Sequence, residues 1–383
     1  MKFALAPHPN AHLVGQADAR AHLSTPALVL EKAAFEANVR AMAAFAADRG
    51  VKLRPHAKTH KSAEIARLQL GAGAIGICVA KLGEAEALHA AGIGPLLITS
   101  PIVSRPQLDR LARLHQDASD LLVVADSVDG AQGLADAAAG AAHPLNVLID
   151  LDIGLHRTGI APGPAALGLI TFVMRHPALR FRGLQAYGGH LQHINDFAER
   201  RSKGLRALEP VAALRDQVAA KGIACEIISG SGTGTFAIDV EAQLFTELQV
   251  GSYVFMDREY NDVETGPQNR VDLQTSLFVE TSVISANHPG IATTDAGLKS
   301  FATEAGPPPI HSGAPEGAKY FFFGDEQGGV LFAQPEHALK PGSRLRCVTP
   351  HCDPTVNLYS HYHVMDGDRL VSLWPVDARG RSA

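Results

Sequence analysis

Leu121-Leu122-Val123-Val124-Ala125-Asp126 and Leu145-Asn146-Val147-Leu148-Ile149-Asp150 decide the fold of this chain. Both stretches are almost wholly apolar, as expected of strands in a parallel sheet that is covered on both faces. Six further short runs of β-rich character accompany them, at Leu53–Ala57, Ile75–Ala80, Pro95–Ser100, Phe181–Tyr187, Cys225–Ser229 and Glu247–Val254.

Helical patterns separate these eight runs. Residues 105–115 and 128–141 are alanine-rich or amphipathic, and Phe35, Val39 and Met42 share one face of a helix that precedes the first strand. Eight strand–helix units over about 200 residues predict a (β/α)8 TIM-like barrel. An open doubly wound sheet is the alternative, but no GxGxxG opens the helix after the first strand.

The character of the sequence changes after Phe255. Alanine-rich stretches give way to short β-like runs between Gly/Pro turns, at 276–283, 320–323, 329–332, 343–348 and 370–374. This pattern predicts a C-terminal all-β domain. We therefore expect an N-terminal segment at 1–25 that joins the β-domain, a barrel at 26–260 and a β-domain at 261–383. The run Pro26–Leu30 is expected to pair with the barrel.

Composition excludes several classes of protein. The 383 residues are 46% hydrophobic and 19% charged, with a net charge of -5 and no basic run, which disfavours nucleic-acid and anionic-membrane partners. No stretch reaches the roughly 18 apolar residues of a membrane span. The first ten residues do not resemble a signal peptide, and the four cysteines form no CxxC, so we expect reduced thiols in a cytoplasmic protein.

The first strand ends beside a lysine. Lys58 lies in Arg54-Pro55-His56-Ala57-Lys58-Thr59-His60-Lys61, next to other cationic or titratable side chains. A lysine amine becomes a nucleophile when its pKa is lowered or when it forms a Schiff base. An exposed lysine in a basic loop is the plain alternative. Strand ends build the active site of a barrel, and the other strand ends also carry reactive side chains, so we favour a functional role.

A glycine-rich loop follows the seventh predicted strand. Ser229-Gly230-Ser231-Gly232-Thr233-Gly234-Thr235 offers close backbone approach, N–H donors and hydroxyl groups, which suit an anion. Val250-Gly251-Ser252-Tyr253 follows on the eighth strand. Loops after strands seven and eight are the favoured phosphate position in barrels, so these two segments are the predicted phosphate site.

Other strand ends carry an arginine, an aromatic ring and histidines. Arg157 has a planar fork that suits a phenolate or carboxylate, although a loop salt bridge is an equal alternative. Tyr187, His190 and His193 follow the sixth strand. One of the two histidines is a candidate general base, and the other is expected to satisfy backbone groups.

The β-domain contains a candidate metal motif. In Pro350-His351-Cys352-Asp353, His351 and Asp353 would point the same way if the segment were extended, and Cys352 would point away. An imidazole and a carboxylate, with the other positions left to water, suit Mn²⁺, Mg²⁺ or Zn²⁺. The HxD pattern by itself is common by chance.

Eight motifs carry a resemblance that covers nearly the whole chain. The chain resembles the D-threonine aldolase group of fold-type III pyridoxal-phosphate enzymes, relatives of alanine racemase and eukaryotic D-serine dehydratase. The motifs are TPALVL (25–30), RPHAKTHK (54–61), GLQAYGGHLQH (183–193), ISGSGTGT (228–235), TELQVGSYVFMD (246–257), DAGLKS (295–300), PHCDPTVNLY (350–359) and WPVDARG (374–380). The resemblance implies an alanine racemase-like barrel with a β-domain, and a head-to-tail homodimer.

The resemblance also implies roles for the candidate residues. Lys58 is similar to the family's Schiff-base lysine, Arg157 to the residue that faces the cofactor's 3-oxygen, and Tyr187 to a wall of the cofactor pocket. His193 is similar to the base that acts on the substrate hydroxyl. The implied phosphate site comprises Ser231, Gly232, Thr233, Gly251, Ser252 and Tyr253, and the implied ligands of a divalent metal (Mn²⁺ first, with Mg²⁺, Co²⁺ or Zn²⁺ as alternatives) are His351 and Asp353.

Three departures from the family pattern concern the substrate. Members of the group read Asp-Glu-His-Gly where this chain has Asp325-Glu326-Gln327-Gly328, often have Asp in place of Ser360, and commonly lack His190. These changes leave the implied cofactor site intact. They put the range of substrate side chains in question.

The implied activity is that of a carbon–carbon lyase (an aldehyde-lyase). It would cleave D-β-hydroxy-α-amino acids, D-threonine or D-3-hydroxyaspartate, to glycine and an aldehyde. A dehydratase acting on D-serine or D-3-hydroxyaspartate is the nearest alternative, with Lys58 removing the α-proton; dehydratases of the family read His-x-Cys, whereas this chain reads His351-Cys352-Asp353. A racemase would need a second base, and a non-catalytic cofactor carrier would lack the β-domain.

Overall fold

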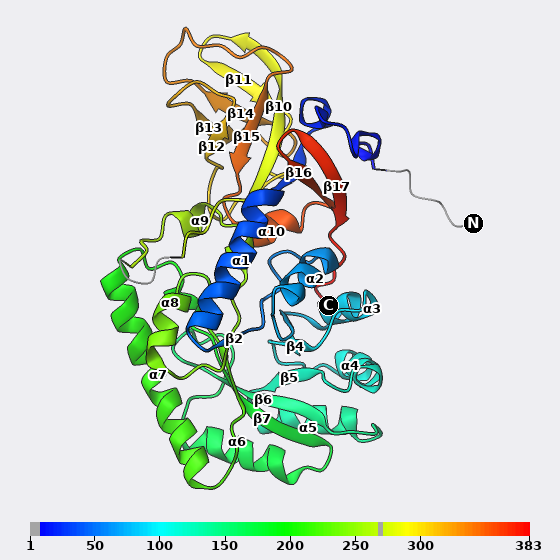
Figure 1. The fold of residues 1–383 in the computed structure, drawn as a ribbon, viewed down its shortest axis with the longest axis vertical. Helices are drawn as coiled ribbons and strands as arrows, with labels where there is room; N and C mark the ends of the chain where they lie inside the picture. The colour runs from blue at the N-terminus through cyan, green and yellow to red at the C-terminus, as the bar shows by residue number, and fades with distance from the viewer. Residues whose placement is uncertain (1–7, 267–270) are drawn as a thin grey trace, which may run out of the picture. The chain divides into compact units, whose positions relative to one another are not determined.

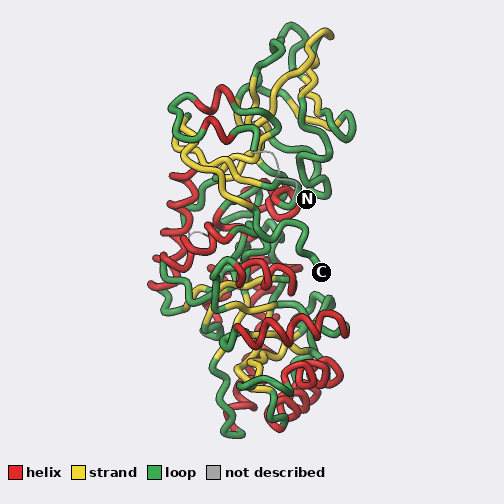
Figure 2. The backbone as a smooth tube through the Cα atoms, turned by 90° about the vertical axis from the view of Figure 1, so that its right-hand side faces the viewer, coloured by secondary structure: helices red, strands yellow, loops and turns green. Residues whose placement is uncertain are grey.

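The computed structural model describes residues 8–266 and 271–383, which form two compact units. The β-unit consists of the described parts of Met1–Asn38, Val254–Asn261 and Leu273–Arg379. The barrel unit consists of the described parts of Val39–Tyr253, Asp262–Asp272 and Gly380–Ala383. Residues 1–7 of the expected N-terminal segment lie outside the description. In Figure 2, helices and strands alternate through the barrel unit, whereas the β-unit is mostly strand and loop.

Eight parallel strands form the sheet of the barrel unit, and each corresponds to a run predicted from the sequence (Figure 1). Every residue of β3 to β6 is buried, which explains why these runs are so apolar. The strands follow the spatial order β2-β9-β8-β7-β6-β5-β4-β3. Their bounds are β2 Lys52–Leu53, β3 Ile77–Val79, β4 Leu96–Ile98, β5 Leu122–Ala125, β6 Leu145–Leu151, β7 Leu179–Ala186, β8 Ile227–Gly230 and β9 Glu247–Leu248.

The segment around β2 closes the sheet on both sides. On one side Leu53 pairs with Leu248 of β9, and the Arg54 N–H donates to Leu248 O at 3.0 Å. On the other side His56 forms a parallel bridge with Cys78 of β3, and the Ala57 N–H donates to Cys78 O at 2.7 Å. The ring of eight strands is therefore complete, and the predicted barrel is confirmed.

Helices follow most of the barrel strands, as predicted. Phe35, Val39 and Met42 are all buried on one face of α1, which spans Lys32–Asp48. The other helices near the barrel are α2 Ala63–Gly71, α3 Leu82–Ala90, α4 Arg105–Asp117, α5 Val128–Ala138, α6 Pro164–Arg175, α7 Phe197–Ala220 and α8 Phe236–Asp239, with the 3-10 turns η3 Gly189–Leu191, η4 Val240–Ala242 and η5 Ser252–Val254.

The β-unit is built on one mixed sheet. Strand β1, Ala27–Glu31, lies between β10, to which it is antiparallel, and β16, to which it is parallel. The expectation that residues 26–30 pair with the barrel is therefore wrong, because the buried face of β1 packs with Leu13, Leu23, Met365 and Leu370 in the core of the β-unit.

Short helices accompany the other strands of the β-unit, and one of them, at 352–356, lies inside the region predicted to be all-β. The strands are β10 Leu277–His288, β11 Ile291–Thr294, β12 Ile310–Ser312, β13 Lys319–Phe322, β14 Gly328–Leu331, β15 Arg344–Val348, β16 His361–Asp366 and β17 Arg369–Pro375. The short helices are η1 Ala11–Leu13, η2 Ala19–His22, α9 Arg258–Asn261 and α10 Cys352–Val356.

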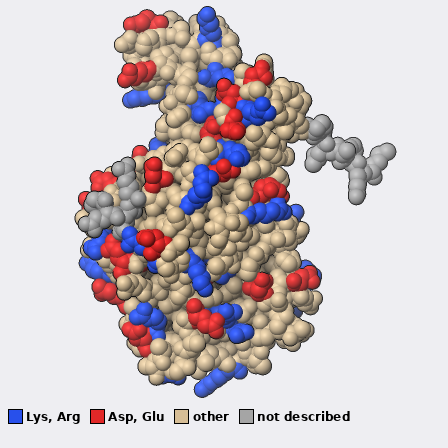
Figure 3. All heavy atoms as spheres, in the orientation of Figure 1, with Lys and Arg blue, Asp and Glu red and all other residues tan. Residues whose placement is uncertain are grey.

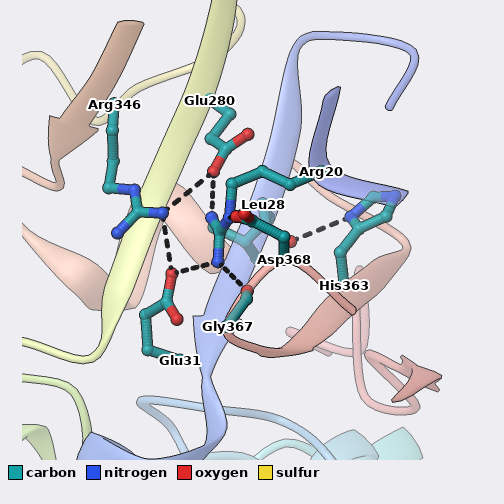
Figure 4. A network of polar contacts seen from close by, with 8 residues as sticks. All are labelled: Arg20, Leu28, Glu31, Glu280, Arg346, His363, Gly367 and Asp368. Atoms are coloured by element: carbon teal, nitrogen blue, oxygen red, sulfur yellow. Dashed lines mark hydrogen bonds and ion pairs between the residues drawn. The ribbon is translucent and has the colours of Figure 1, made fainter. Parts of the chain in front are cut away.

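Two arginines and two glutamates cross-link this sheet (Figure 4). Arg20 contacts Glu280 of β10 and donates to Glu31 of β1 at 2.8 Å. Arg346 of β15 reaches the same two carboxylates at 3.1 and 3.5 Å. Arg20 also donates to Asp368 at 3.0 Å, so the network ties η2, β1, β10 and β15 together around the buried Glu280.

Basic and acidic side chains are interspersed on the face of the molecule drawn in Figure 3. This distribution matches the absence of a basic run in the sequence. Within residues 8–266 and 271–383, no helix combines the length and the apolar character that crossing a bilayer requires.

A buried ion pair joins β2 to β9, and it generates a prediction about stability. Arg54 donates from Nε and Nη2 to the two carboxylate oxygens of Glu247, at 2.8 and 3.0 Å, and the two side chains are 5% and 2% exposed. Arg54→Met leaves Glu247 as an unpaired buried charge. We expect a loss of about 3–5 kcal/mol in the free energy of unfolding, measured by chemical denaturation.

The double variant Arg54→Met/Glu247→Met should recover most of that loss, because it removes both charges. Arg105→Met is the matched control, since Arg105 and its partner Asp109 are 80% and 50% exposed. Equal stability of the single and double variants would contradict a role for charge pairing at this junction.

Candidate active site

The predicted cofactor residues lie in loops that follow successive strands of the barrel unit. Parallel strands bring their carboxyl ends to one rim of a barrel, so these loops share that rim. Lys58 follows β2, Arg157 follows β6 and Tyr187 follows β7; the loops after β8 and β9 contribute Ser231, Gly232, Thr233, Gly251, Ser252 and Tyr253.

The loop that carries Lys58 is fixed by His56. Nδ1 of His56 accepts the Lys58 N–H at 3.3 Å, so the ring proton lies on Nε2. That proton is donated to Thr99 Oγ1 at 3.0 Å, and the Thr99 hydroxyl donates onward to Val79 O at 3.1 Å. The half-buried Lys58 therefore leaves the closing strand in a fixed direction.

A second chain of hydrogen bonds runs from this loop to Tyr253. His60 accepts the Ser62 N–H at Nδ1 and donates from Nε2 to Gln69 at 3.2 Å. Gln69 in turn donates to the Tyr253 hydroxyl at 3.1 Å. Burial raises the pKa of Tyr253 well above its usual value, so the phenol stays neutral. Tyr253 thus links the β9 loop to the Lys58 loop.

The loop after β8 is the predicted phosphate loop. Ser231 adopts a left-handed φ of +76°, and Ser231 and Thr233 are buried. Among residues 8–266 and 271–383, the backbone N–H groups of Ser231, Gly232 and Thr233 have no hydrogen-bond acceptor. Consecutive N–H groups around a left-handed residue bind phosphate oxygens in other proteins, so these residues fit the phosphate of pyridoxal phosphate.

Thr59 supplies a further polar atom for a ligand. It is wholly buried, and its Oγ1 has no hydrogen-bond partner in the described part of the chain. A Cβ at Gly251 would lie 2.7 Å from that oxygen. Glycine at this position therefore leaves the threonine hydroxyl accessible from the β9 loop. Buried hydroxyl groups usually form a hydrogen bond, so this one suits a bound ligand.

Polar side chains also cross the interior of the barrel. Gln185 donates to Asp150 at 2.8 Å and to Thr99 O at 3.0 Å, and Gln249 donates to Gln185 at 3.2 Å and to Ser229 at 2.9 Å. Burial raises the pKa of Asp150 to about 6, and hydrogen bonds from Gln185 and Thr158 oppose that rise. These hydrogen bonds connect β6, β7, β8 and the residue after β9, close to where the loops with the predicted cofactor residues begin.

Arg157 and Tyr187 meet at this rim. The guanidinium carbon of Arg157 lies 5.6 Å from the centre of the Tyr187 ring, in cation–π geometry. A Cβ at Gly189 would lie 2.9 Å from the same ring, so glycine there makes room for the tyrosine. The Asp152 carboxylate accepts the N–H groups of Gly154 and His156 and thereby shapes the loop that ends in Arg157.

The two histidines after β7 differ in their surroundings. His193 is exposed just beyond η3, and the buried Gln192 precedes it. His190 lies close to Gly154, whose Cβ would approach its ring to 3.4 Å. Burial lowers the pKa of His190, and the Asp152 carboxylate opposes the shift.

His351 and Asp353 are not arranged as the extended segment assumed. His351 has extended φ and ψ angles, but it caps the helix α10, and Asp353 lies in the first turn of that helix. The helix begins there because Asp257 accepts the Cys352 N–H at 2.8 Å. The i, i+2 argument from strand geometry is therefore wrong, although Cys352 is buried between the two residues, as a non-ligand would be.

The charged neighbours of His351 are carboxylates. Its Nδ1 lies 2.8 Å from Glu304 and 3.6 Å from Glu259. No group of three His, Cys, Asp or Glu side chains with metal-binding geometry gathers within residues 8–266 and 271–383. The donor set nevertheless consists of oxygen and imidazole nitrogen, which suits a hard divalent ion that keeps several waters.

The remaining departures from the family pattern lie in the β-unit. Gln327 is exposed in the turn between β13 and β14. The Ser360 hydroxyl accepts a hydrogen bond from Arg379. An aspartate in its place would form an ion pair with the same arginine. Compared with aspartate, Ser360 therefore keeps the contact with Arg379 but lacks the negative charge.

Sequence reasoning missed several buried polar residues of the barrel: Thr59, Gln69, Asp150, Gln185, Gln192 and Gln249. A signal was available, because Gln185, Gln192 and Gln249 all lie inside the long motifs at 183–193 and 246–257. Buried amides require partners on other strands, and a single sequence does not identify those partners.

Two family models match parts of this chain. Residues 30–259 match the family described as "Alanine racemase, N-terminal domain", and residues 276–365 match "Putative serine dehydratase domain". The chain is 39% identical to D-threonine aldolase from Arthrobacter sp over 95% of each chain. It is 35% identical to 3-hydroxy-D-aspartate aldolase from Paracoccus denitrificans (strain Pd 1222), over 94% of this chain and 93% of that protein.

A solved structure shares the fold over almost the same length. D-threonine aldolase from Filomicrobium marinum superposes with a TM-score of 0.90 at 35% identity, covering 94% of this chain and 97% of that one. The chain therefore belongs to the alanine racemase-like, fold-type III family of pyridoxal-phosphate enzymes, in the group that includes D-threonine aldolase and 3-hydroxy-D-aspartate aldolase.

Proposed function

We propose that this protein is a pyridoxal-phosphate-dependent, metal-activated aldolase that cleaves D-threonine and related D-β-hydroxy-α-amino acids to glycine and an aldehyde. The observation that carries the proposal is the near full-length identity of 39% and 35% to two aldolases, against 27% to D-threo-3-hydroxyaspartate dehydratase from Delftia sp. (strain HT23). The aspartate in His351-Cys352-Asp353 supports it, since the dehydratase pattern has cysteine at that position.

The barrel unit offers a partner for each part of the cofactor. The Lys58 amine would react with the cofactor's aldehyde, and the N–H groups of Ser231, Gly232 and Thr233 would hold the phosphate. Arg157 would face the ring's 3-oxygen, with Tyr187 beside it. When bound, pyridoxal phosphate supplies an electron sink for the substrate's Cα.

The bond changes of the reaction balance without an oxidant or a co-reactant. His193 takes the proton of the β-hydroxyl, the Cα–Cβ bond breaks, and Cβ becomes the carbonyl carbon of the aldehyde. The electron pair of that bond remains with Cα, which then takes a proton to complete glycine. His193 suits this role because its side chain is exposed beside the loops that hold the cofactor residues.

A divalent metal would assist the same step. His351 and Asp353 are the proposed ligands, and the metal would acidify the substrate hydroxyl. Mn²⁺ is our first choice, with Mg²⁺, Co²⁺ and Zn²⁺ as alternatives, because a set of one imidazole and one carboxylate suits any of them. We also propose a homodimer, on the family resemblance.

An aldolase for 3-hydroxy-D-aspartate is the second candidate. The 35% identical relative from Paracoccus denitrificans favours it, and the two activities differ only in the side chain that leaves as the aldehyde. The chemistry proposed for Lys58 and His193 would be the same.

Product analysis separates these reactions. The purified protein, incubated with pyridoxal phosphate, Mn²⁺ and D-threonine, should yield glycine and acetaldehyde in equal amounts. The same assay with D-3-hydroxyaspartate measures the preference between side chains. Formation of 2-oxobutyrate and ammonia from D-threonine would identify a dehydratase instead and contradict the proposal.

Replacement of Lys58 tests the cofactor attachment. Lys58→Ala should abolish cleavage and the visible absorbance of the cofactor–lysine imine, because no other amine is expected to replace it. Lys52→Ala is the matched control, since Lys52 is an exposed lysine on β2. A Lys58→Ala protein that still forms the imine would show that another lysine carries the cofactor.

Removal of the metal tests His351 and Asp353. Treatment with EDTA should abolish cleavage but leave the imine absorbance, and added Mn²⁺ should restore activity. Asp353→Asn should weaken Mn²⁺ binding, measured by electron paramagnetic resonance, whereas Asp325→Asn, at an exposed aspartate, should not. Full activity of metal-free protein would remove the metal from the mechanism.

A further inference from the structure

We propose that Gln192 is a positioning residue that couples the phosphate loop, residues 231–235, to the segment that carries His193. This inference rests on the proposed function for the role of His193, but the coupling itself concerns cofactor binding alone. Gln192 is a buried amide that takes no part in the bond changes of the proposed reaction.

Gln192 joins its own segment to the phosphate loop through three hydrogen bonds of its side chain. Its Nε2 donates to Gly188 O at 3.1 Å and to Thr235 Oγ1 at 3.0 Å, and its Oε1 accepts the Gly234 N–H at 3.0 Å. Both amide hydrogens and the carbonyl oxygen are therefore engaged, and the residue is 1% exposed. A buried amide with all its groups satisfied has one preferred position.

These bonds decide which atoms of the loop remain for a phosphate. The Thr235 hydroxyl donates to Asp239 at 2.6 Å, so its lone pair is what accepts Gln192. The Thr235 N–H donates to Gly232 O, and the Gly234 N–H is held by Gln192. The N–H groups of Ser231, Gly232 and Thr233 are thus the ones left to face an anion.

Packing leaves little room for the two segments to move independently. A Cβ at Gly232 would lie 2.4 Å from the Gln192 side chain, and a Cβ at Gly234 would lie 2.0 Å from its backbone oxygen. A small cavity behind the loop is lined from both segments, by Gly188, Leu191, Ser231, Thr235, Asp239 and Phe245. A shift of the phosphate loop therefore displaces Gln192, and His193 is the next residue.

No close substitute reproduces these contacts. Glutamate is isosteric with glutamine, but it has no donor for Gly188 O or Thr235 and would bury a charge beside the Asp239 carboxylate. Asparagine is one methylene shorter and cannot span the same distance. The coupling therefore depends on glutamine at this position and on the hydroxyl of Thr235.

Hydrogen–deuterium exchange on the apoprotein tests the coupling directly. Pyridoxal phosphate should slow exchange in peptides covering 231–235 and, in the wild type, also in peptides covering 188–196. Pyridoxal, which lacks the phosphate, should not protect residues 188–196. In Gln192→Ala, pyridoxal phosphate should still protect 231–235 but no longer 188–196.

Thr235→Val and Thr235→Ser provide a milder, matched pair, because only the serine keeps the hydroxyl. Thr235→Val should reduce the protection of 188–196, and Thr235→Ser should retain it. In holoprotein saturated with cofactor, Gln192→Ala and Thr235→Val should lower kcat by about 10- to 100-fold with little change in KM, as expected when a proton-transfer group is displaced by about 1 Å.

Three results would overturn the inference. They are unchanged protection of 188–196 in both Gln192→Ala and Thr235→Val, protection by pyridoxal equal to that by pyridoxal phosphate, and absence of protection at 188–196 in the wild type. Failure of the proposed function is a separate outcome: the exchange coupling would persist in the wild type while D-threonine and D-3-hydroxyaspartate gave no glycine.

Discussion

The strand segment at 52–57 holds the barrel together from both sides. The Arg54–Glu247 pair and the backbone bonds to Leu248 join it to β9, and the bridge between His56 and Cys78 joins it to β3. Lys58 follows immediately. The contacts that close the ring of strands therefore also fix the position of the Lys58 backbone. If the closing segment became loose, the lysine would move with it.

Polar groups in the barrel unit are organised in connected sets. One runs from His56 through Thr99 to Gln185 and Asp150, and another from His60 through Gln69 to Tyr253. These contacts connect the Lys58 loop with β6, β7, α2 and the loop after β9, so these segments constrain one another. A buried polar network loses stability when one of its hydrogen bonds is missing. The network therefore favours loops that already hold their positions before the cofactor binds.

The parts predicted well from sequence were those set by local pattern. Apolar runs such as 121–126 identified the buried strands, and the glycine-rich stretch at 229–235 does follow a strand, as predicted. The failures were set by distant partners. Residues 26–30 were expected to pair with the barrel, whereas β10 and β16 lie on either side of them. The argument for His351 and Asp353 required an extended segment, and the contact from Asp257 that starts a helix there is not visible in one sequence. The buried glutamines were overlooked for the same reason.

Because β1 pairs with β16, the first strand of the chain must wait for a strand near its C-terminus before that pair can form. Val29 lies opposite His363, whereas every barrel strand is complete once Leu248 has been made. A nascent chain can therefore assemble the barrel strands while β1, apolar from Ala27 to Leu30, still lacks a neighbour. An unpaired apolar edge is prone to wrong association. The apolar strand β1 of the nascent protein therefore stays open to wrong association until β10 and then β16 are made.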